Sequence, residues 1–186
     1  MRKIAVLFVT LLVLVSCGKK TDVNYTYEIK SRPVDMSGYD DLNSTEHAFK
    51  AITVQELFNC IDNKSSGIFY LGRTNCGCCQ TCISYLNQAA MESNVTIYYM
   101  DVYDEQMPIT NKDIADQLKL YLFDILFIND KGERELQTPT VFNVVNGEIK
   151  DSIICLDKFA WDDPPTKTQE YQLLNKYKEI FKPFIK

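Results

Sequence analysis

Apolar residues recur at helical spacing in four stretches of the chain. In the first of these, Thr53 and Glu56 have the spacing of a capping box, which predicts a helix start. Val54, Leu57, Phe58 and Ile61 follow at helical spacing. The pattern therefore predicts helices at about residues 53–63, 76–93, 113–122 and 167–181.

Short apolar runs rich in β-branched and aromatic residues lie between these helices and predict strands. The runs cover residues 68–71, 95–102, 140–145 and 148–154. Asn146-Gly147 separates the last two, and this pair is the strongest short signal for a β-hairpin. Residues 125–128 are apolar but too few to distinguish a strand from a helix.

The order of these elements predicts an α/β fold. Strand–helix–strand units imply a parallel pair of strands joined by a right-handed crossover. The hairpin adds antiparallel strands, so the sheet is expected to be mixed. The chain carries no internal repeat. The residues after position 48, about 140 of them, are enough for one domain with its own core.

The first residues differ from the rest. Met1-Arg2-Lys3 precedes an apolar run that ends in Leu14-Val15-Ser16-Cys17. The run is too short to span a membrane, which takes about 20 apolar residues. It resembles the lipobox of bacterial lipoproteins, which implies a signal peptide at residues 1–16 and acylation of Cys17. We therefore expect an extracytoplasmic protein of the cell envelope, attached to a membrane by lipid on Cys17.

Residues 17–48 are polar and predict a flexible tether behind the acylated cysteine. The formal charge of the chain is −5, and loss of Arg2 and Lys3 with the signal peptide would make it −7. Since no basic patch interleaved with aromatic residues is present, nucleic acid is not an expected partner.

Four of the seven cysteines lie within seven residues: Cys76, Cys78, Cys79 and Cys82. Cys76 and Cys79 form a Cys-x-x-Cys motif between a predicted strand and a predicted helix. A helix N-terminus offers unpaired N–H groups and partial positive charge, which favour a thiolate. We therefore expect Cys76 to be the exposed nucleophile and Cys79 the sheltered resolving thiol.

Two separated motifs resemble the thioredoxin-like superfamily. One is the segment Gly72-Arg73-Thr74-Asn75-Cys76-Gly77-Cys78-Cys79, and the other is Thr138-Pro139-Thr140 before the hairpin. The resemblance implies a thioredoxin fold over residues 49–186, with a central mixed β-sheet and helices on both faces. It also implies a cis Pro139 opposite the dithiol and a substrate chain held by Thr138 and Pro139. The residues around the cluster resemble those of the thioredoxin-like bacteriocin transport accessory proteins more than those of thioredoxin itself.

The chain also departs from the thioredoxin pattern. Tyr70 lies six residues before Cys76, near the position where thioredoxins carry a buried carboxylate. Without that acid, deprotonation of Cys79 needs water or another group. Arg73, three residues before Cys76, could stabilise the Cys76 thiolate by its charge.

The remaining cysteines leave alternatives open. Cys78 and Cys82 are possible third thiols. The alternative for Cys82 is a buried small residue, the commonest state of a free cysteine and the one we expect for Cys60 and Cys155. The four clustered cysteines could instead bind a soft ion, Cu(I) or zinc. A third possibility is a thioredoxin-fold module that only binds a partner.

The function that the sequence predicts is a thiol–disulfide oxidoreductase that needs no cofactor. Its catalytic residues would be Cys76 and Cys79. Its partners would be protein or peptide thiols and disulfides, together with a membrane electron donor or acceptor. The direction of electron flow does not follow from the sequence, because small local changes set the reduction potential.

Overall fold

The structure is a computed structural model that describes residues 27–42, 46–102, 111–154 and 165–185. Its centre is a five-stranded sheet in the order β1-β3-β2-β6-β7. The strands are β1 (Phe49–Ala51), β2 (Gly67–Gly72), β3 (Ile97–Asp101), β6 (Thr140–Val145) and β7 (Glu148–Ile154). Strands β1, β3 and β2 run parallel, and β6 pairs antiparallel with β2 and with β7. The predicted mixed sheet is therefore confirmed.

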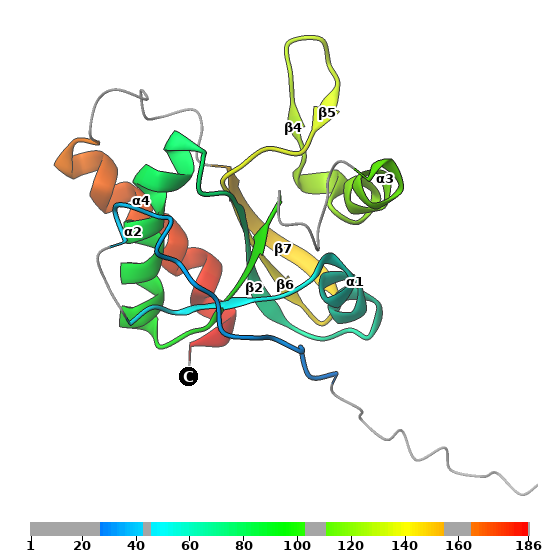
Figure 1. The fold of residues 1–186 in the computed structure, drawn as a ribbon, viewed down its shortest axis with the longest axis horizontal. Coiled ribbons are helices and arrows are strands. Elements are labelled where there is room, and N and C mark those ends of the chain that lie inside the picture. Colours follow the sequence, from blue (N-terminus) through cyan, green and yellow to red (C-terminus); the bar gives the residue numbers. More distant parts are fainter. Residues whose placement is uncertain (1–26, 43–45, 103–110, 155–164, 186) are drawn as a thin grey trace, which may run out of the picture.

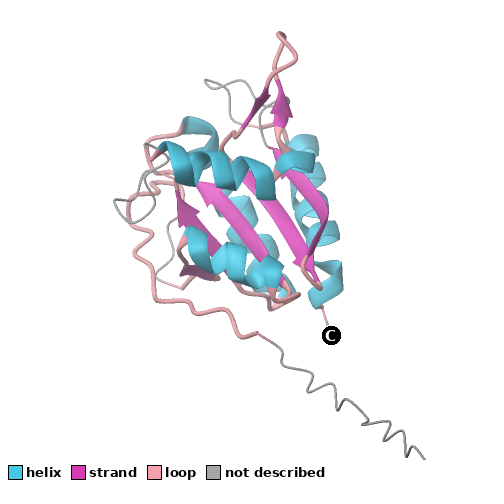
Figure 2. Ribbon diagram, turned by 90° about the vertical axis from the view of Figure 1, so that its right-hand side faces the viewer, coloured by secondary structure: helices cyan, strands magenta, loops and turns pink. Residues whose placement is uncertain are grey.

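Helices cover both faces of this sheet (Figures 1 and 2). Helices α2 (Gly77–Ser93) and α4 (Lys167–Phe181) lie on one face, and α1 (Val54–Asp62) and α3 (Lys112–Tyr121) lie on the other. Two buried clusters reflect these layers, since residues of α2 and α4 share one cluster and residues of α1 and α3 share the other. Alternating side chains of β2 and β3 enter the two clusters in turn. This arrangement is the thioredoxin fold that the sequence predicted.

The predicted elements agree closely with those observed. The helix predicted from residue 76 begins at Gly77, with Cys76 as its N-cap. The hairpin turns at Asn146 and Gly147, which have φ values of 53° and 80°. Positive φ at both positions is what a two-residue hairpin turn of this hand requires.

The apolar stretch at residues 125–128 proves to be divided. It forms the end of a 3₁₀ turn (η1, Phe123–Ile125) and then β4 (Phe127–Ile128). Strand β4 pairs with β5 (Arg134–Glu135) in a separate two-stranded sheet. This small hairpin projects beyond the main sheet (Figure 1). The short β1 strand was not predicted, because three residues carry too little periodicity to be recognised.

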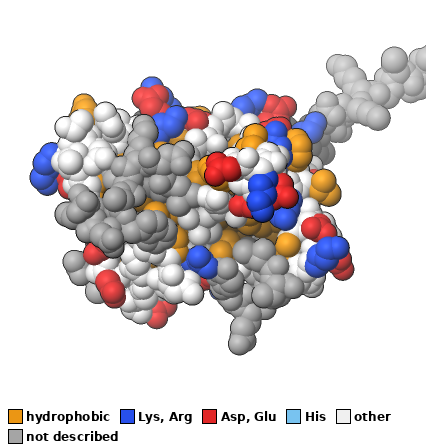
Figure 3. All heavy atoms as spheres, turned by 90° about the horizontal axis from the view of Figure 1, so that it is seen from above, with side chains coloured by type: hydrophobic (Ala, Val, Ile, Leu, Met, Phe, Trp, Pro, Cys, Tyr) orange, Lys and Arg blue, Asp and Glu red, His pale blue; other side chains and the backbone are white. Residues whose placement is uncertain are grey.

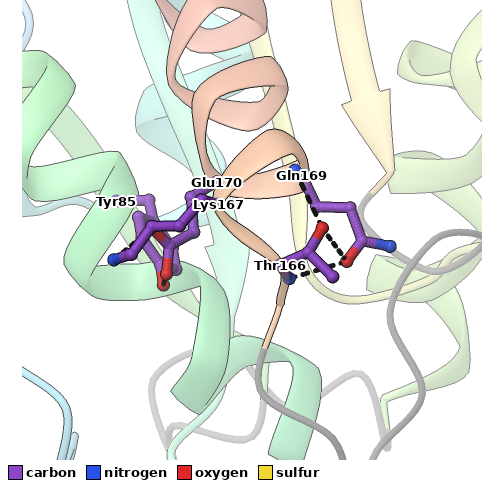
Figure 4. A network of polar contacts seen from close by, with 5 residues as sticks. All are labelled: Tyr85, Thr166, Lys167, Gln169 and Glu170. Carbon is purple, nitrogen blue, oxygen red and sulfur yellow. Dashed lines mark hydrogen bonds and ion pairs between the residues drawn. The ribbon is translucent and has the colours of Figure 1, made fainter.

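Helix α4 begins with a capping box at Thr166 (Figure 4). The Thr166 hydroxyl accepts from the Gln169 N–H, and the Gln169 side chain accepts from the Thr166 N–H. One residue further, Glu170 accepts a hydrogen bond of 3.0 Å from the Tyr85 hydroxyl of α2. The start of α4 is therefore attached to α2, the helix that carries the cysteines.

Part of the predicted tether belongs to the folded domain. Met36, Tyr39 and Leu42 are buried in the cluster that contains Cys76 and Cys79. Arg32 forms an isolated antiparallel bridge with Ala51 of β1. Residues 27–42, called the N-terminal segment below, therefore pack on the domain, and the expected boundary at residue 49 is too late for these residues. Residues 1–26, which include the predicted signal peptide, lie outside the described residues, as do residues 43–45.

A buried side-chain amide joins strand β6 of the sheet to helix α4. Asn143 of β6 donates 2.7 Å to the Ile180 carbonyl and accepts 3.0 Å from the Asp151 N–H, beside an irregularity in the β6–β7 register. Two backbone groups of different elements thus depend on one side chain.

We predict that Asn143→Leu, of similar volume, lowers the free energy of unfolding by about 1–3 kcal/mol for each backbone group left unpaired. Chemical denaturation followed by circular dichroism measures this change. Asn63→Ala is the matched control, because the exposed Asn63 amide also donates to a backbone carbonyl, that of Asn59. The control should stay within about 0.5 kcal/mol of the parent. Equal stability of the Asn143 variant would show that this amide does not hold α4.

Candidate functional site

The Cys-x-x-Cys motif lies where β2 ends and α2 begins. Gly72 ends β2, and four residues later Cys76 caps α2. The Cys76 Sγ accepts a hydrogen bond of 3.3 Å from the Cys79 N–H. The first turn of α2 carries no acidic residue to offset the positive end of the helix dipole. The local field at Cys76 therefore favours a negative sulfur.

The second predicted motif, Thr138-Pro139-Thr140, lies beside the Cys76 sulfur. The Thr138–Pro139 peptide bond is cis, as the resemblance implied. The Thr138 hydroxyl donates to the Cys76 Sγ at 3.7 Å, and the Cys76 thiol donates to the Thr138 carbonyl at 3.7 Å. The fold thus brings together Cys76 and Thr138, which are 62 residues apart.

The two thiols of the motif differ strongly in acidity. The interaction with the Cys79 thiol, the Cys79 N–H, the Thr138 hydroxyl and the Arg73 side chain together lower the pKa of Cys76 to about 5, against the opposing effect of burial. The interaction with the Cys76 sulfur, followed by burial, raises the pKa of Cys79 far above its ordinary value. At neutral pH the pair therefore holds a thiolate on Cys76 and a proton on Cys79.

One expectation about Cys76 is wrong. Its side chain is only 3% exposed, not open to solvent. Thr138 contacts its sulfur, and the N-terminal segment packs in the same buried cluster at this end of α2. Gln80 connects α2 with this segment, since it donates to the carbonyls of Gly38 and Thr74 at 2.8 and 2.5 Å and accepts from the Asp40 N–H at 2.8 Å. No local sequence signal could identify Gln80, because its partner Asp40 is 40 residues away.

The two extra cysteines of the cluster differ from each other. Cys78 is a free, buried thiol, and burial followed by the charge of Cys76 raises its pKa. Cys82 is disulfide-bonded. The interpretation of Cys82 as a free third thiol is therefore corrected for this state of the protein. Cys60 is free and fully buried, as expected, and Cys17 and Cys155 lie outside the described residues.

The disulfide at Cys82 also weakens the metal alternative. A sulfur in a disulfide carries no thiolate to bind a soft ion. Among the described residues, no group of three or more His, Cys, Asp or Glu side chains is placed to hold a metal ion. The four-cysteine site that the spacing suggested is thus not assembled in this state.

The face shown in Figure 3 carries charged side chains of both signs spread apart, with apolar side chains between them. No basic patch gathers among the described residues on that face.

Comparison with known proteins gives only distant similarity. No protein-family model and no curated protein matches the chain. Among solved structures, thioredoxin O2 from Arabidopsis thaliana in the oxidized state is 15% identical over 75% of this chain and 96% of its own, with a TM-score of 0.46. Thioredoxin O1 from the same plant is 16% identical over 75% of this chain and 99% of its own, with a TM-score of 0.45. We assign the fold from the strand order and connections described above.

The contrast between the two thiols leads to a prediction. We expect iodoacetamide to modify Cys76 faster than any other described cysteine, at a rate that stays nearly constant from pH 9 to pH 7. The rate should fall only as the pH approaches the lowered pKa of Cys76, because protonation then removes the thiolate. Peptide mass mapping after short reaction times identifies the modified residue.

Arg73→Gln tests the effect of the guanidinium at the same time. Loss of its charge should move the midpoint of this pH profile upward. Cys60→Ser serves as a control, since Cys60 is buried away from the motif and its pKa is raised to about 11. A Cys76 rate that rises steeply between pH 7 and pH 9 would mean an ordinary thiol and would contradict this electrostatic picture.

Proposed function

We propose that this protein is a thiol–disulfide oxidoreductase that acts through Cys76 and Cys79. The observation that carries the proposal is the division of acidity within the pair, beside Thr138 and cis Pro139. A thiolate is the form that attacks disulfides, so Cys76 is suited to the first step. The protonated, buried Cys79 is the thiol for the second step. The thioredoxin fold by itself does not carry this conclusion, because one fold hosts many functions.

In the reducing direction, the Cys76 thiolate attacks a substrate disulfide. One substrate sulfur leaves as a thiolate, and Cys76 is left in a mixed disulfide with the other. Cys79 then attacks the Cys76 sulfur, releases the second substrate sulfur and loses its own proton. The substrate gains two electrons and the chain holds a Cys76–Cys79 disulfide. The oxidising direction is the reverse, and each cycle needs an external thiol or disulfide to restore the protein.

Thr138 and Pro139 are the proposed contacts for the substrate chain. The Thr138 carbonyl and hydroxyl both reach the Cys76 sulfur. The Cys76 thiolate has no proton to donate, so the Thr138 carbonyl is available to a backbone N–H of an extended peptide. Peptide or protein substrates follow from this arrangement. The likeness to bacteriocin transport accessory proteins agrees with a peptide substrate.

The lipobox resemblance supports a location in the cell envelope, with lipid on Cys17 and a membrane donor or acceptor of electrons as partner. None of the described helices is long and apolar enough to cross a membrane. Several acyl chains on one residue would give a stable anchor, whereas a single chain gives only marginal binding.

A redox titration of the purified protein against glutathione buffers tests the function. We expect one reversible two-electron step, measured as thiols trapped by alkylation and counted by mass. The step should disappear in Cys76→Ser and in Cys79→Ser and persist in Cys60→Ser, which removes an equally buried thiol outside the motif. Its midpoint then assigns oxidant or reductant. Thiols that do not react with glutathione would indicate a module that only binds a partner. Metal that copurifies at about one ion per chain would indicate that the cysteines bind metal.

Cys79→Ser should trap the intermediate. Because the resolving thiol is missing, a mixed disulfide between Cys76 and a peptide substrate should accumulate to about one per chain. Intact mass under non-reducing conditions measures it. Rapid loss of the adduct in this variant would mean that Cys78, the nearest other free thiol in the sequence, can resolve it.

A further inference from the structure

The small hairpin β4–β5 projects from the end of the main sheet at which the Cys-x-x-Cys motif lies. Strand β6 begins at Thr140, which pairs with Leu71 beside the end of β2, and the chain that leads to Thr140 comes from the hairpin. Figure 1 shows the hairpin standing clear of the five-stranded sheet. Arg134 of β5 comes four residues before Thr138, so their Cα atoms lie at most about 14 Å apart. A peptide held at Thr138 is therefore within reach of β5.

The backbone of Arg134 lies on a free edge of this hairpin. The Asn129 N–H donates to the Glu133 carbonyl at 3.0 Å, so these two residues are opposed at a hydrogen-bonded position of the antiparallel ladder. Hydrogen-bonded and non-hydrogen-bonded pairs alternate, which makes the next pair, Ile128 and Arg134, non-hydrogen-bonded. The N–H and C=O groups of Arg134 therefore point away from β4. The small sheet has two strands, so no other strand of the described chain pairs with this edge.

Side-chain contacts hold the hairpin in one conformation. The Asn129 side-chain oxygen accepts from the N–H groups of Lys131 and Glu133, both at 2.9 Å, and so fixes the turn. At the base, the Arg134 guanidinium donates to the Phe123 carbonyl at 2.9 Å and lies 4.2 Å from the centre of the Phe123 ring. A strand edge that is already ordered can pair with a peptide at little further cost in conformational entropy.

One face of the hairpin is largely apolar. Ile128 and Arg134 are directly opposed, so their side chains lie on the same face. Ile128 is 55% exposed, and Phe123, under the Arg134 guanidinium, is 51% exposed. We call this surface the apolar face. A side chain of an added strand that points to it would meet hydrocarbon and an aromatic ring.

The opposite face is acidic. Glu133 and Glu135 flank Arg134 in the sequence, so their side chains point to the other side of the strand. Both are exposed, and both accept from the Asn129 amide, at 3.1 and 2.6 Å. An amide carries no charge, so it orients the two carboxylates without neutralising them. This acidic face favours a basic side chain on a bound peptide.

We propose that the substrate binds as an additional strand along the free edge of β5, and that it is an extended, cysteine-containing peptide in which apolar and basic residues alternate. The inference rests on the proposed function. The Thr138 carbonyl accepts a backbone N–H near the substrate cysteine, and the N–H and C=O groups of Arg134 pair with a residue further along the same peptide. Because the side chains of a strand alternate between its faces, one set meets the apolar face and the other meets the acidic face.

Arg134→Pro and Arg134→Ala test the backbone contact. Proline removes the outward N–H and is tolerated at such edge positions, whereas alanine removes the same side chain and keeps the N–H. The probe is a nine-residue peptide of alternating Leu and Lys around a central cysteine, which carries 5-thio-2-nitrobenzoate as a mixed disulfide. Attack by Cys76 bonds it to the peptide sulfur and releases the coloured thiolate. We expect Arg134→Pro to react at least about fivefold more slowly than Arg134→Ala, the effect of one lost hydrogen bond.

Two controls accompany this comparison. The small disulfide 5,5′-dithiobis(2-nitrobenzoate) has no peptide backbone and should react with Cys76 at the same rate in both variants. A peptide N-methylated only at the two residues nearest each end keeps the amides beside its cysteine and tests the edge without any change to the protein. The parent protein should react with it at least about fivefold more slowly than with the unmethylated peptide. This measurement decides the question if circular dichroism shows that Arg134→Pro does not fold.

A second peptide, with Glu in place of each Lys, tests the acidic face. We expect the parent to react faster with the Lys peptide, and the preference to shrink at high salt because the charges are exposed. Glu133→Gln combined with Glu135→Gln should remove most of this preference. Glu92→Gln combined with Glu179→Gln is the matched control, since it removes the same net charge from exposed positions of α2 and α4. The control should keep the preference.

Equal rates of the folded Arg134→Pro and Arg134→Ala variants with the Lys peptide would overturn the inference. Equal rates of the parent with the methylated and unmethylated peptides would do the same, as would a preference for Lys that both double variants reduce alike. If Cys76 of the parent does not react even with the small disulfide, the proposed function fails, and this inference fails with it.

Discussion

The hydrogen bond from the Cys79 N–H to the Cys76 sulfur is the interaction on which the candidate chemistry depends. It makes a sulfur the N-cap of α2, a position that usually belongs to an oxygen. The same contact stabilises the helix start and negative charge on the sulfur. The Cys76 sulfur therefore both caps the helix and carries the reactive charge. Residues that hold the start of α2 in place also affect the pKa of Cys76.

Three elements hold that start in place. β2 delivers the chain to the motif, and its parallel and antiparallel neighbours fix the end of the strand. The segment before β6 supplies Thr138 opposite the sulfur. The N-terminal segment covers the motif and is attached through Gln80. As a result the local field favours a thiolate on Cys76, while neighbouring residues bury its side chain.

The N-terminal segment also belongs to the buried core. Tyr39 lies on it, in the cluster that contains Cys76 and Cys79, and its hydroxyl lies 3.0 Å from that of Tyr99. A polar stretch that looks like a tether in the sequence thus carries one of the most deeply buried residues of the domain. If the chain is anchored through Cys17, only residues 18–26 would remain between the anchor and the packed part of this segment.

Several features could be read from the sequence because they are local. The Cys-x-x-Cys helix start, the Asn146-Gly147 turn and the capping patterns at Thr53 and Thr166 each depend on residues within one turn of one another. The order of helices and strands then indicated the thioredoxin fold, because connection rules leave few alternatives. Pro139 came from the resemblance, not from spacing.

Other features were decided only by the tertiary structure, for a common physical reason. The burial of Cys76, the packing of Tyr39 and the role of Gln80 all arise from contacts between residues about 40 or more positions apart, which leave no periodic trace in the sequence. The chain Tyr39–Tyr99–Asp101 likewise joins the N-terminal segment to β3. Cys82 shows the same limit, since its position beside Cys79 on α2 could be read from the spacing but its disulfide could not. Local interactions within the Cys76–Cys79 pair made it recognisable and contribute most to the lowered pKa of Cys76, whereas long-range packing buries the pair and places Thr138 beside the sulfur.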